Sequence, residues 1–326
     1  MNLSSISSFN LYLPLFDDIR QQKKAFARNA AYLILMLVFY FAGSHSLALF
    51  FNTGLKEYYC LHPSDILIIG HSMSEMGIDK TVLENQTKIQ IGKYCINGAG
   101  PTERLVMLKH YIETTQTQPK ILIYDVGSRI FAANLSSRSH ELFYPFINES
   151  KACRDFINKH TNTCEKLLLS INPLCRYELT RLGAVQRGFT HDWKCRKTTR
   201  FDPMLFQQQV KQGNFWRITF EETEMTAFKE TLEFCQSNHI RVILLALPNV
   251  DLLNQAEPNK YENAMKLLES FANRMENITF LDYNPGFSSQ YDLFADPIHL
   301  SPYGQKVMTE QVGQDLLRLQ TAGNLF

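Results

Sequence analysis

The stretch 65–74, DILIIGHSMS, decides the fold that this sequence predicts. A short apolar run that ends at a glycine is typical of a strand buried on both faces of a sheet. The polar residues after it indicate a tight turn into a helix, so Ser72 lies where the strand ends and the helix begins. A hydroxyl in such a turn is exposed at the edge of the sheet and can act as a nucleophile. A serine at a helix start is most often only a cap, so the turn alone does not establish catalysis.

Four more apolar runs follow the same pattern, with longer helical segments between them. The predicted strands are 65–70, 89–96, 120–126, 241–247 and 278–282, and the predicted helices include 102–114, 222–238, 262–274 and 303–319. Alternating strands and helices predict an α/β fold with about five parallel strands. Residues 135–215 contain no strand-like run, and we expect a helical insertion there, either as a lid or substrate platform or as plain helical packing.

Composition narrows the class of protein. The chain has 326 residues, with 33 Lys and Arg against 32 Asp and Glu, and 45% of its residues are hydrophobic. These values are typical of a globular protein and disfavour disordered, collagen-like and polybasic nucleic-acid-binding proteins. The seven cysteines form no CxxC pair and no Cys/His cluster at zinc spacing, and glycine-rich phosphate loops are missing from the sequence. We therefore expect no metal site and no cofactor.

An apolar run near the N-terminus predicts a membrane anchor. Ala30–Phe51 has 22 residues without a formal charge, which as a helix would reach about 33 Å. The cations before it are Arg20, Lys23, Lys24 and Arg28. The positive-inside rule then places residues 1–29 in the cytoplasm and the domain at 60–326 outside it, which for a bacterial cytoplasmic membrane is the periplasm. A cleavable signal peptide and a buried helix are alternatives, but the long preceding segment and the lack of a polar face argue against them.

A second motif, DPIHLSPYG at 296–304, lies between the last predicted strand and the last predicted helix. An aspartate three residues before a histidine can bond one ring nitrogen and fix the tautomer, which leaves the other nitrogen to deprotonate a serine. Asp296 and His299 are therefore candidates for the acid and base that activate Ser72. The structural alternative is that Asp296 caps a turn and His299 bonds a backbone carbonyl.

The two motifs together with the βα pattern resemble the SGNH (GDSL-like) hydrolase and acyltransferase superfamily from about residue 65 to 320. The resemblance implies a flavodoxin-like three-layer sandwich and a triad of Ser72, His299 and Asp296. It also implies an oxyanion hole that includes a glycine N–H after the second strand. Gly100 matches that glycine, with Gly98 as the other candidate.

The sequence departs from the family pattern at two positions. His71 replaces the usual aspartate before the serine, and Arg129 follows the third strand where the family has an oxyanion asparagine. An arginine can donate hydrogen bonds to a developing oxyanion or bind an anionic substrate group. An N-terminal anchor, a short serine motif and a late DxxH also look like the membrane-anchored DltD-like proteins of envelope acylation.

Other residues at the predicted carboxyl edge of the sheet, and two tryptophans elsewhere, are weaker candidates for a functional role. Asn249, after the fourth strand, is a candidate substrate contact, whereas Asp125 is expected to be a hydrogen-bonded strand end and not a second catalytic carboxylate. Trp193 and Trp216 flank the basic stretch 194–200, which is either a solvated face or a surface for lipid headgroups or an acidic glycan.

The expected redox state of the cysteines depends on the predicted compartment. Cys95 and Cys235 are expected in the core. Outside the cytoplasm, the cysteines of the insertion become disulfide candidates, with no pairing fixed by the sequence: Cys153, Cys164, Cys175 and Cys195.

The leading hypothesis is a membrane-anchored serine esterase or O-acyltransferase that modifies a cell-envelope glycan through an acyl-enzyme on Ser72. Its expected partners are the bilayer, an envelope glycan or acyl-carrying substrate, and a membrane-bound acyl-transferring protein; nucleic acid is not expected. The main alternative is a catalytically inactive SGNH-fold binding or assembly protein of an envelope polysaccharide modification system. A lipase that acts directly on membrane lipid is a third hypothesis.

Overall fold

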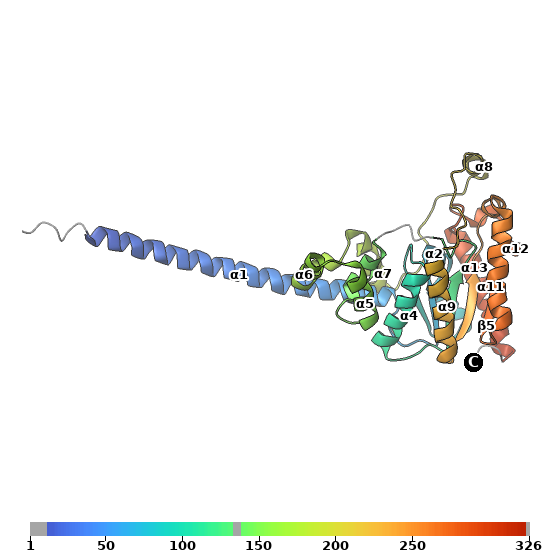
Figure 1. Ribbon diagram of the computed structural model, residues 1–326, viewed down its shortest axis with the longest axis horizontal. Coiled ribbons are helices and arrows are strands. Elements are labelled where there is room, and N and C mark those ends of the chain that lie inside the picture. Colours follow the sequence, from blue (N-terminus) through green and yellow to red (C-terminus); the bar gives the residue numbers. More distant parts are fainter. Residues whose placement is uncertain (1–11, 133–137, 324–326) are drawn as a thin grey trace, which may run out of the picture.

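The computed structural model describes residues 12–132 and 138–323, and its centre is a parallel sheet (Figure 1). The strands are β1 Ile66–Gly70, β2 Ile91–Cys95, β3 Ile121–Val126, β4 Arg241–Ala246 and β5 Ile278–Asp282. They lie side by side in the order β2-β1-β3-β4-β5, and every neighbouring pair is parallel. This is the flavodoxin-like order, so the predicted α/β fold is confirmed, with strand ends shifted by one or two residues.

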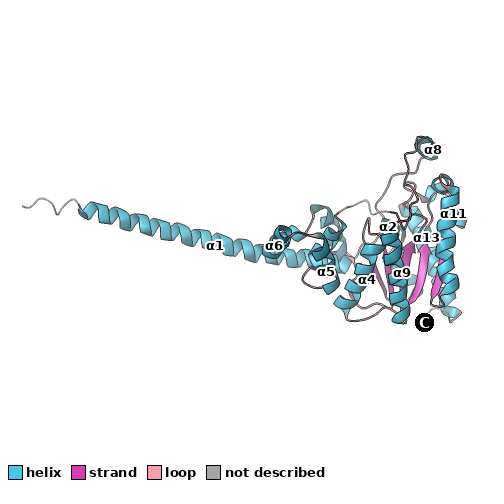
Figure 2. Cartoon of the chain, viewed as in Figure 1, coloured by secondary structure: helices cyan, strands magenta, loops and turns pink. Residues whose placement is uncertain are grey.

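Helices cover both faces of the sheet (Figure 2). One face carries α4 Pro101–Thr115, α9 Glu222–Ser237 and α11 Pro258–Arg274, and the other carries α3 Lys80–Thr87 and α13 Pro302–Thr321. Short helices in the loops are α2 Ser72–Gly77, α10 Asp251–Gln255, α12 Asn284–Phe287 and η4 Tyr291–Leu293. The four predicted helices are confirmed with shifted ends.

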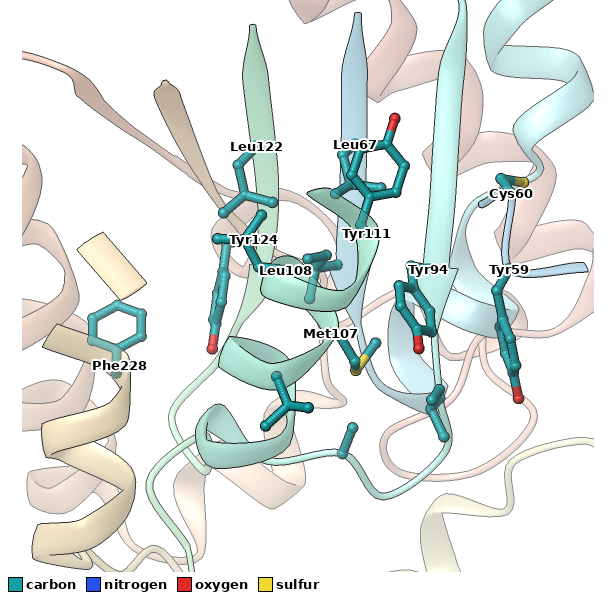
Figure 3. Close-up of a cluster of buried hydrophobic side chains, with 14 of the residues drawn as sticks. Tyr59, Cys60, Leu67, Tyr94, Met107, Leu108, Tyr111, Leu122, Tyr124 and Phe228 are labelled. Atoms are coloured by element: carbon teal, nitrogen blue, oxygen red, sulfur yellow. The ribbon is translucent and has the colours of Figure 1, made fainter. Parts of the chain in front are cut away.

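Two apolar clusters, one on each face of the sheet, hold these layers together. Along β1, Leu67 and Ile69 belong to one cluster and Ile66 and Ile68 to the other, because successive side chains of a strand point to opposite faces. All four side chains are completely buried. Figure 3 shows the first cluster, where Leu67 and Leu122 of the strands meet α4 and α9. Truncating one of these leucines to alanine would lower the free energy of unfolding by about 2 to 5 kcal/mol.

Between β3 and β4 the described residues form only helices and loops. Besides α9, the elements are η1 Ser139–Phe146, α5 Lys151–His160, α6 Thr163–Ile171, η2 Pro173–Arg176, η3 Leu179–Arg181, α7 Leu182–Phe189 and α8 Pro203–Lys211. Helix α7 packs tightly on the N-terminal helix, since a Cβ at Gly188 would lie 1.9 Å from the carbonyl oxygen of Gly54. Part of the segment predicted as an insertion therefore braces the N-terminal helix.

The N-terminal helix α1 spans Tyr12–Tyr58. Of the helices in the described part of the chain, it contains the one stretch, Arg20–Tyr58, that is long and apolar enough to cross a membrane by length and composition. Only 11% of its most apolar stretch is buried in the protein, which argues against a core helix. Its last turns are tied to the domain, as Trp193 Nε1 donates to the carbonyl of Tyr58 at 3.1 Å. The single apolar N-terminal helix is thus confirmed.

The disulfide prediction is wrong for this structure, in which all seven cysteines are free thiols. Cys153 and Cys195 are buried in different places, with Cys195 Sγ 3.4 Å from the carbonyl of Leu300, whereas Cys164 and Cys175 are exposed. The expectation rested on the presence of four cysteines in one segment, but the fold does not bring them together in pairs. Cys95 and Cys235 are buried, as predicted.

Candidate active site

Ser72 and His299 meet at the carboxyl edge of the sheet. Ser72 is the first residue of α2, which His71 joins to β1, and its Oγ lies 2.8 Å from Nε2 of His299. The two residues are 227 positions apart in the sequence. The contact forms because β1, an interior strand of the sheet, ends at the same carboxyl edge to which the loop before α13 returns. The structure therefore brings together the two motifs that the sequence singled out.

Asp296 bonds the other ring nitrogen of His299. Its Oδ2 lies 2.8 Å from His299 Nδ1, and its Oδ1 accepts the backbone N–H groups of Ile298 and His299 at 2.9 and 2.8 Å. Burial opposes ionisation of Asp296, but the hydrogen bonds from His299, Lys197 and Ile298 outweigh it and hold the pKa of the carboxyl well below its usual range. With the ring proton on Nδ1 donated to this carboxylate, Nε2 is left to accept the Ser72 proton.

The rest of the DPIHLSPYG motif shapes this loop. Phe294 and Leu300 form an isolated antiparallel bridge that closes it, and Ser301 Oγ caps α13 by accepting the N–H of Gly304 at 3.1 Å. A Cβ at Gly304 would lie 2.0 Å from the carbonyl oxygen of Leu293, so only glycine fits. The bridge, the cap and the close approach at Gly304 thus hold Asp296 and His299 in place.

Lys197 is a member of the site that sequence reasoning missed. Its ammonium group bonds Oδ2 of Asp296 and lies 3.4 Å from His299 Nδ1. The segment around it is fixed by Thr199 Oγ1, which donates to the carbonyl of Ala295 at 3.0 Å. The sequence marked the basic stretch 194–200, but only the fold shows which of its cations reaches the triad.

His71 is bonded to a buried carboxylate. Its Nδ1 lies 2.7 Å from Oδ2 of Asp125, and the same oxygen accepts the backbone N–H groups of His71 at 3.3 Å and Ser74 at 3.2 Å. Burial opposes ionisation of Asp125, yet the His71 ring, Arg104 and the Ser74 hydrogen bond outweigh it and keep its pKa below the usual range. Asp125 thus fixes the turn that carries Ser72 and is a hydrogen-bonded strand end, as predicted.

The Ser72 hydroxyl opens into a pocket of about 310 Å³. Ser72 and His299 lie in its wall, and the remainder is largely apolar. Its other lining residues include His71, Asn97, Gly98, Ile130, Trp216 and Ile298. A pocket of this size and character fits an acyl group beside the nucleophile.

The backbone of Gly100 is already engaged. Gly100 is the N-cap of α4, and its N–H donates to Oε2 of Glu103 at 2.9 Å in a capping box. It is therefore not aimed at the pocket as an oxyanion donor, contrary to the first choice from the sequence. Gly98 lies on the pocket wall at a φ of +77° and is exposed, so it is the remaining glycine candidate. The N–H of Ser72, first in a helix and without an intrahelical partner, is a second donor.

Arg129 borders the pocket but is bound by the protein. Nε donates to the carbonyl of Trp216 at 2.7 Å, Nη2 to the carbonyl of Leu253 at 2.9 Å, and Nη1 to Ser128 Oγ at 3.0 Å. The residue is 4% exposed, and burial lowers the pKa of the guanidinium to about 10. These bonds engage all three nitrogens of the guanidinium that the sequence suggested as an oxyanion donor or a site for an anionic substrate group, and they make Arg129 a clamp between the loop after β3 and two distant segments.

The other predicted residues divide between the site and the scaffold. Trp216 lines the Ser72 pocket, whereas Trp193 is buried against α1. Asn249 is buried beside a small hollow of about 10 Å³ that His71 and Arg129 also line. Its backbone N–H donates to Asn284 Oδ1 at 3.1 Å, so its position is set by the scaffold.

One group of side chains in the described residues has the spacing of metal ligands, and it lies outside the Ser72 pocket. His140 and Glu141 of η1 and Glu165 of α6 place ligand atoms within 4.8 Å of one another. Arg138 pairs with both carboxylates, which neutralises the charge that would attract a cation. None of these three residues lines the Ser72 pocket.

No family model matches the sequence, and no curated protein matches it significantly. Similar solved structures include a GDSL-like lipase from Bacteroides thetaiotaomicron, with a TM-score of 0.40, 11% identity, and coverage of 77% of this chain and 86% of that one. A G-D-S-L family protein from Desulfitobacterium hafniense, described as lipolytic, has a TM-score of 0.39 and 14% identity, with coverage of 77% of this chain and 99% of that one. An active-site mutant of a family two carbohydrate esterase from Clostridium thermocellum has a TM-score of 0.37 and 8% identity, with coverage of 80% of this chain and 65% of that one. Likenesses this low carry no information on the reaction of this chain.

Proposed function

We propose that this chain is a serine esterase or O-acyltransferase that forms an acyl-enzyme on Ser72. The observation that carries the proposal is the hydrogen-bonded series from Ser72 Oγ to His299 Nε2 and from His299 Nδ1 to Asp296 Oδ2, both at 2.8 Å. This is the arrangement that activates a serine for acyl transfer. It recurs in unrelated folds, so its geometry supports the function independently of the SGNH resemblance.

The first half-reaction follows from these contacts. His299 Nε2 takes the proton of Ser72 as Oγ attacks the carbonyl carbon of an ester, and a tetrahedral oxyanion forms. Asp296 stabilises the imidazolium by accepting from Nδ1. As the carbon–oxygen bond to the leaving alcohol breaks, that alcohol takes the proton from Nε2, and the acyl group remains on Ser72. The backbone N–H groups of Ser72 and Gly98 are the proposed oxyanion donors.

The second half-reaction repeats the first in reverse. His299 Nε2 takes the proton of an incoming hydroxyl as its oxygen attacks the acyl carbonyl. The bond from the acyl carbon to Ser72 Oγ then breaks, and Oγ takes the proton back from Nε2. Water gives hydrolysis and a sugar hydroxyl gives acyl transfer, so the same groups serve both outcomes. The pocket beside Ser72 is largely apolar and supports a bound acyl group. An envelope glycan as the acceptor, and a membrane-bound protein that delivers the acyl donor, complete the proposal.

Membrane attachment is supported by an apolar surface that continues from α1. Helix α7 packs against α1, and Phe189 stacks on Phe50 with ring centroids 4.7 Å apart. Exposed apolar side chains of α6, η3 and α7 extend this surface: Leu167, Leu168, Ile171, Leu179, Leu182 and Phe189. We propose that α1 anchors the chain in the bacterial cytoplasmic membrane and that this surface rests in the periplasmic lipid interface. The Ser72 pocket would then face the envelope.

Labelling of the full-length protein in detergent with a fluorophosphonate tests the acyl-enzyme proposal, with peptide mass spectrometry to locate the adduct. We expect modification of Ser72 in the wild type and none in Ser72→Ala. Ser170→Ala is the matched control, since Ser170 is an exposed serine of α6, and it should label like the wild type.

A non-catalytic binding or assembly protein is the second candidate. It is favoured by one observation, namely that Gly100 and Arg129, the donors expected for the oxyanion, are both engaged inside the protein. Folded wild-type protein that takes no label, under conditions that label a control esterase, would favour this candidate over the enzyme.

A further inference from the structure

A second pocket, of about 460 Å³, adjoins the Ser72 pocket. Asn97 lines both, and Lys197 lines the second pocket while its ammonium group bonds the triad carboxylate of Asp296. The far wall includes Tyr58 and Tyr59, at the end of α1. The pocket thus lies between the triad and the point where the N-terminal helix joins the domain.

The wall of this pocket has an excess of positive charge. Five of its residues are cationic: Arg181, Arg187, Lys194, Arg196 and Lys197. Its carboxylates are Glu75 and Glu178. The oxygens of Glu75 and Glu178 accept hydroxyl groups of Tyr58 and Thr180, at 2.7 and 3.0 Å, and no ion pair joins them to the five cations in the described residues. A concave wall with this surplus attracts anions.

Some of the cations are neutralised within the protein and some are not. Lys197 bonds Asp296, and Arg196 bonds Asp192. Arg187 donates to two backbone carbonyls, and its guanidinium lies 5.0 Å from the ring centre of Tyr58. The ammonium of Lys194 is exposed and has no ion pair in the part of the chain that the structure describes.

Arg181 gives the independent sign of a missing ligand. It is 9% exposed, and its Nη1 donates to the carbonyl of Leu142 at 2.7 Å. Its Nη2 is buried without a hydrogen-bond partner, and no carboxylate of the described residues lies within 4.0 Å of the guanidinium. A guanidinium stays charged, so burying it without a counter-ion is costly unless an anion binds there.

We infer that this second pocket binds a phosphate group carried by the substrate whose acyl group reaches Ser72. The role of this anionic group as part of an acyl substrate rests on the proposed function. Its binding in the pocket does not. The anion would bond Arg181 Nη2 and the ammonium of Lys194. It would lie beside the triad, because Asn97 lines both pockets and Lys197 of this pocket bonds Asp296. The pocket would then select charged substrates over neutral ones.

Binding to the full-length Ser72→Ala protein in a zwitterionic detergent tests this inference without turnover. The probes are glucose 6-phosphate against glucose for a phosphate on a sugar, and dihexanoyl phosphatidic acid against dihexanoyl phosphatidylcholine for a phosphate on a lipid. Calorimetry should show that at least one phosphorylated probe binds ten times more tightly than its partner. The preferred probe identifies the source of the anion, and added salt should weaken its binding.

Variants locate the bound anion. Arg181→Met should weaken the preferred probe at least tenfold, and Lys194→Ala, which changes an exposed side chain and leaves the fold intact, should weaken it severalfold. Lys229→Ala, an exposed lysine of α9, is the control and should change nothing. Equal affinity for charged and neutral probes, or a Lys194→Ala protein that binds like the wild type, would overturn the inference. Anion binding by a protein that takes no fluorophosphonate label would leave the pocket assigned and remove only the acyl-transfer proposal.

Discussion

The triad and the expected oxyanion donors lie on two sides of the Ser72 pocket, and both were predicted from short sequence motifs. Their hydrogen bonds in the structure differ. On one side, Ser72, His299 and Asp296 are joined by two hydrogen bonds of 2.8 Å. On the other side, Gly100 and Arg129 were expected to donate to an oxyanion, but they donate to Glu103 and to backbone carbonyls. The two donors are engaged in different ways: the Gly100 N–H bonds a carboxylate three residues along the chain, whereas the acceptors of Arg129 at Trp216 and Leu253 lie far away in the sequence.

The largest expected effect concerns the triad side. Ser72→Ala and His299→Gln should each lower kcat by about 10⁵- to 10⁶-fold, and the double variant should be no worse than either, because the two residues act as a unit. The measurement is turnover of a short-chain ester in a double-variant cycle. Additive losses would mean that His299 does not act through Ser72, and the comparison between the two sides would fail.

Asp296→Asn should lower kcat by about 10³- to 10⁴-fold, since the amide no longer holds the ring in the required tautomer. It should also change the pH dependence of stability. The pKa of Asp296 is lowered in the folded protein, so its stabilisation is present above about pH 4, the usual value, and is lost as the pH falls below it. Urea titrations from pH 6 to pH 3 should show a shallower loss of unfolding free energy in the variant than in the wild type. Equal slopes would show that the carboxylate is not stabilised by its partners.

Arg129→Met should affect stability more than catalysis. Removing the guanidinium leaves buried carbonyls and a hydroxyl without a donor, so the unfolding free energy should fall by about 2 to 4 kcal/mol. Among folded molecules, kcat should stay within about tenfold of the wild type, because this cation is not directed at the reacting atoms. Arg129→Lys is the matched control for charge. A hundredfold loss of kcat with unchanged stability would instead make Arg129 an oxyanion donor and remove the contrast between the two sides.

The sequence predicted the sheet well because its strands are continuous apolar runs that only a doubly covered sheet can bury. All five strands were located, as were the helices after Gly100 and Ser301. The triad was predictable for a related reason, since Asp296 is three residues from His299 and the turn between them is closed by local bonds. Lys197 was not predictable as a partner of Asp296, because a segment 99 residues away must fold back to bring it there. The same limit applies to Arg129, whose acceptors at Trp216 and Leu253 lie far along the chain.

The smallest expected effect concerns the capping box at α4. Glu103→Ala removes the acceptor of the Gly100 N–H, which should lower the unfolding free energy by about 1 kcal/mol, as loss of a helix cap does. Glu103→Gln keeps an acceptor oxygen and should cost less. If Gly98 and Ser72 supply the oxyanion donors, kcat should be nearly the same in both variants and in the wild type. A severalfold rise of kcat in Glu103→Ala alone would show that a released Gly100 N–H can serve the oxyanion. This side of the pocket would then be kept from catalysis by a single carboxylate.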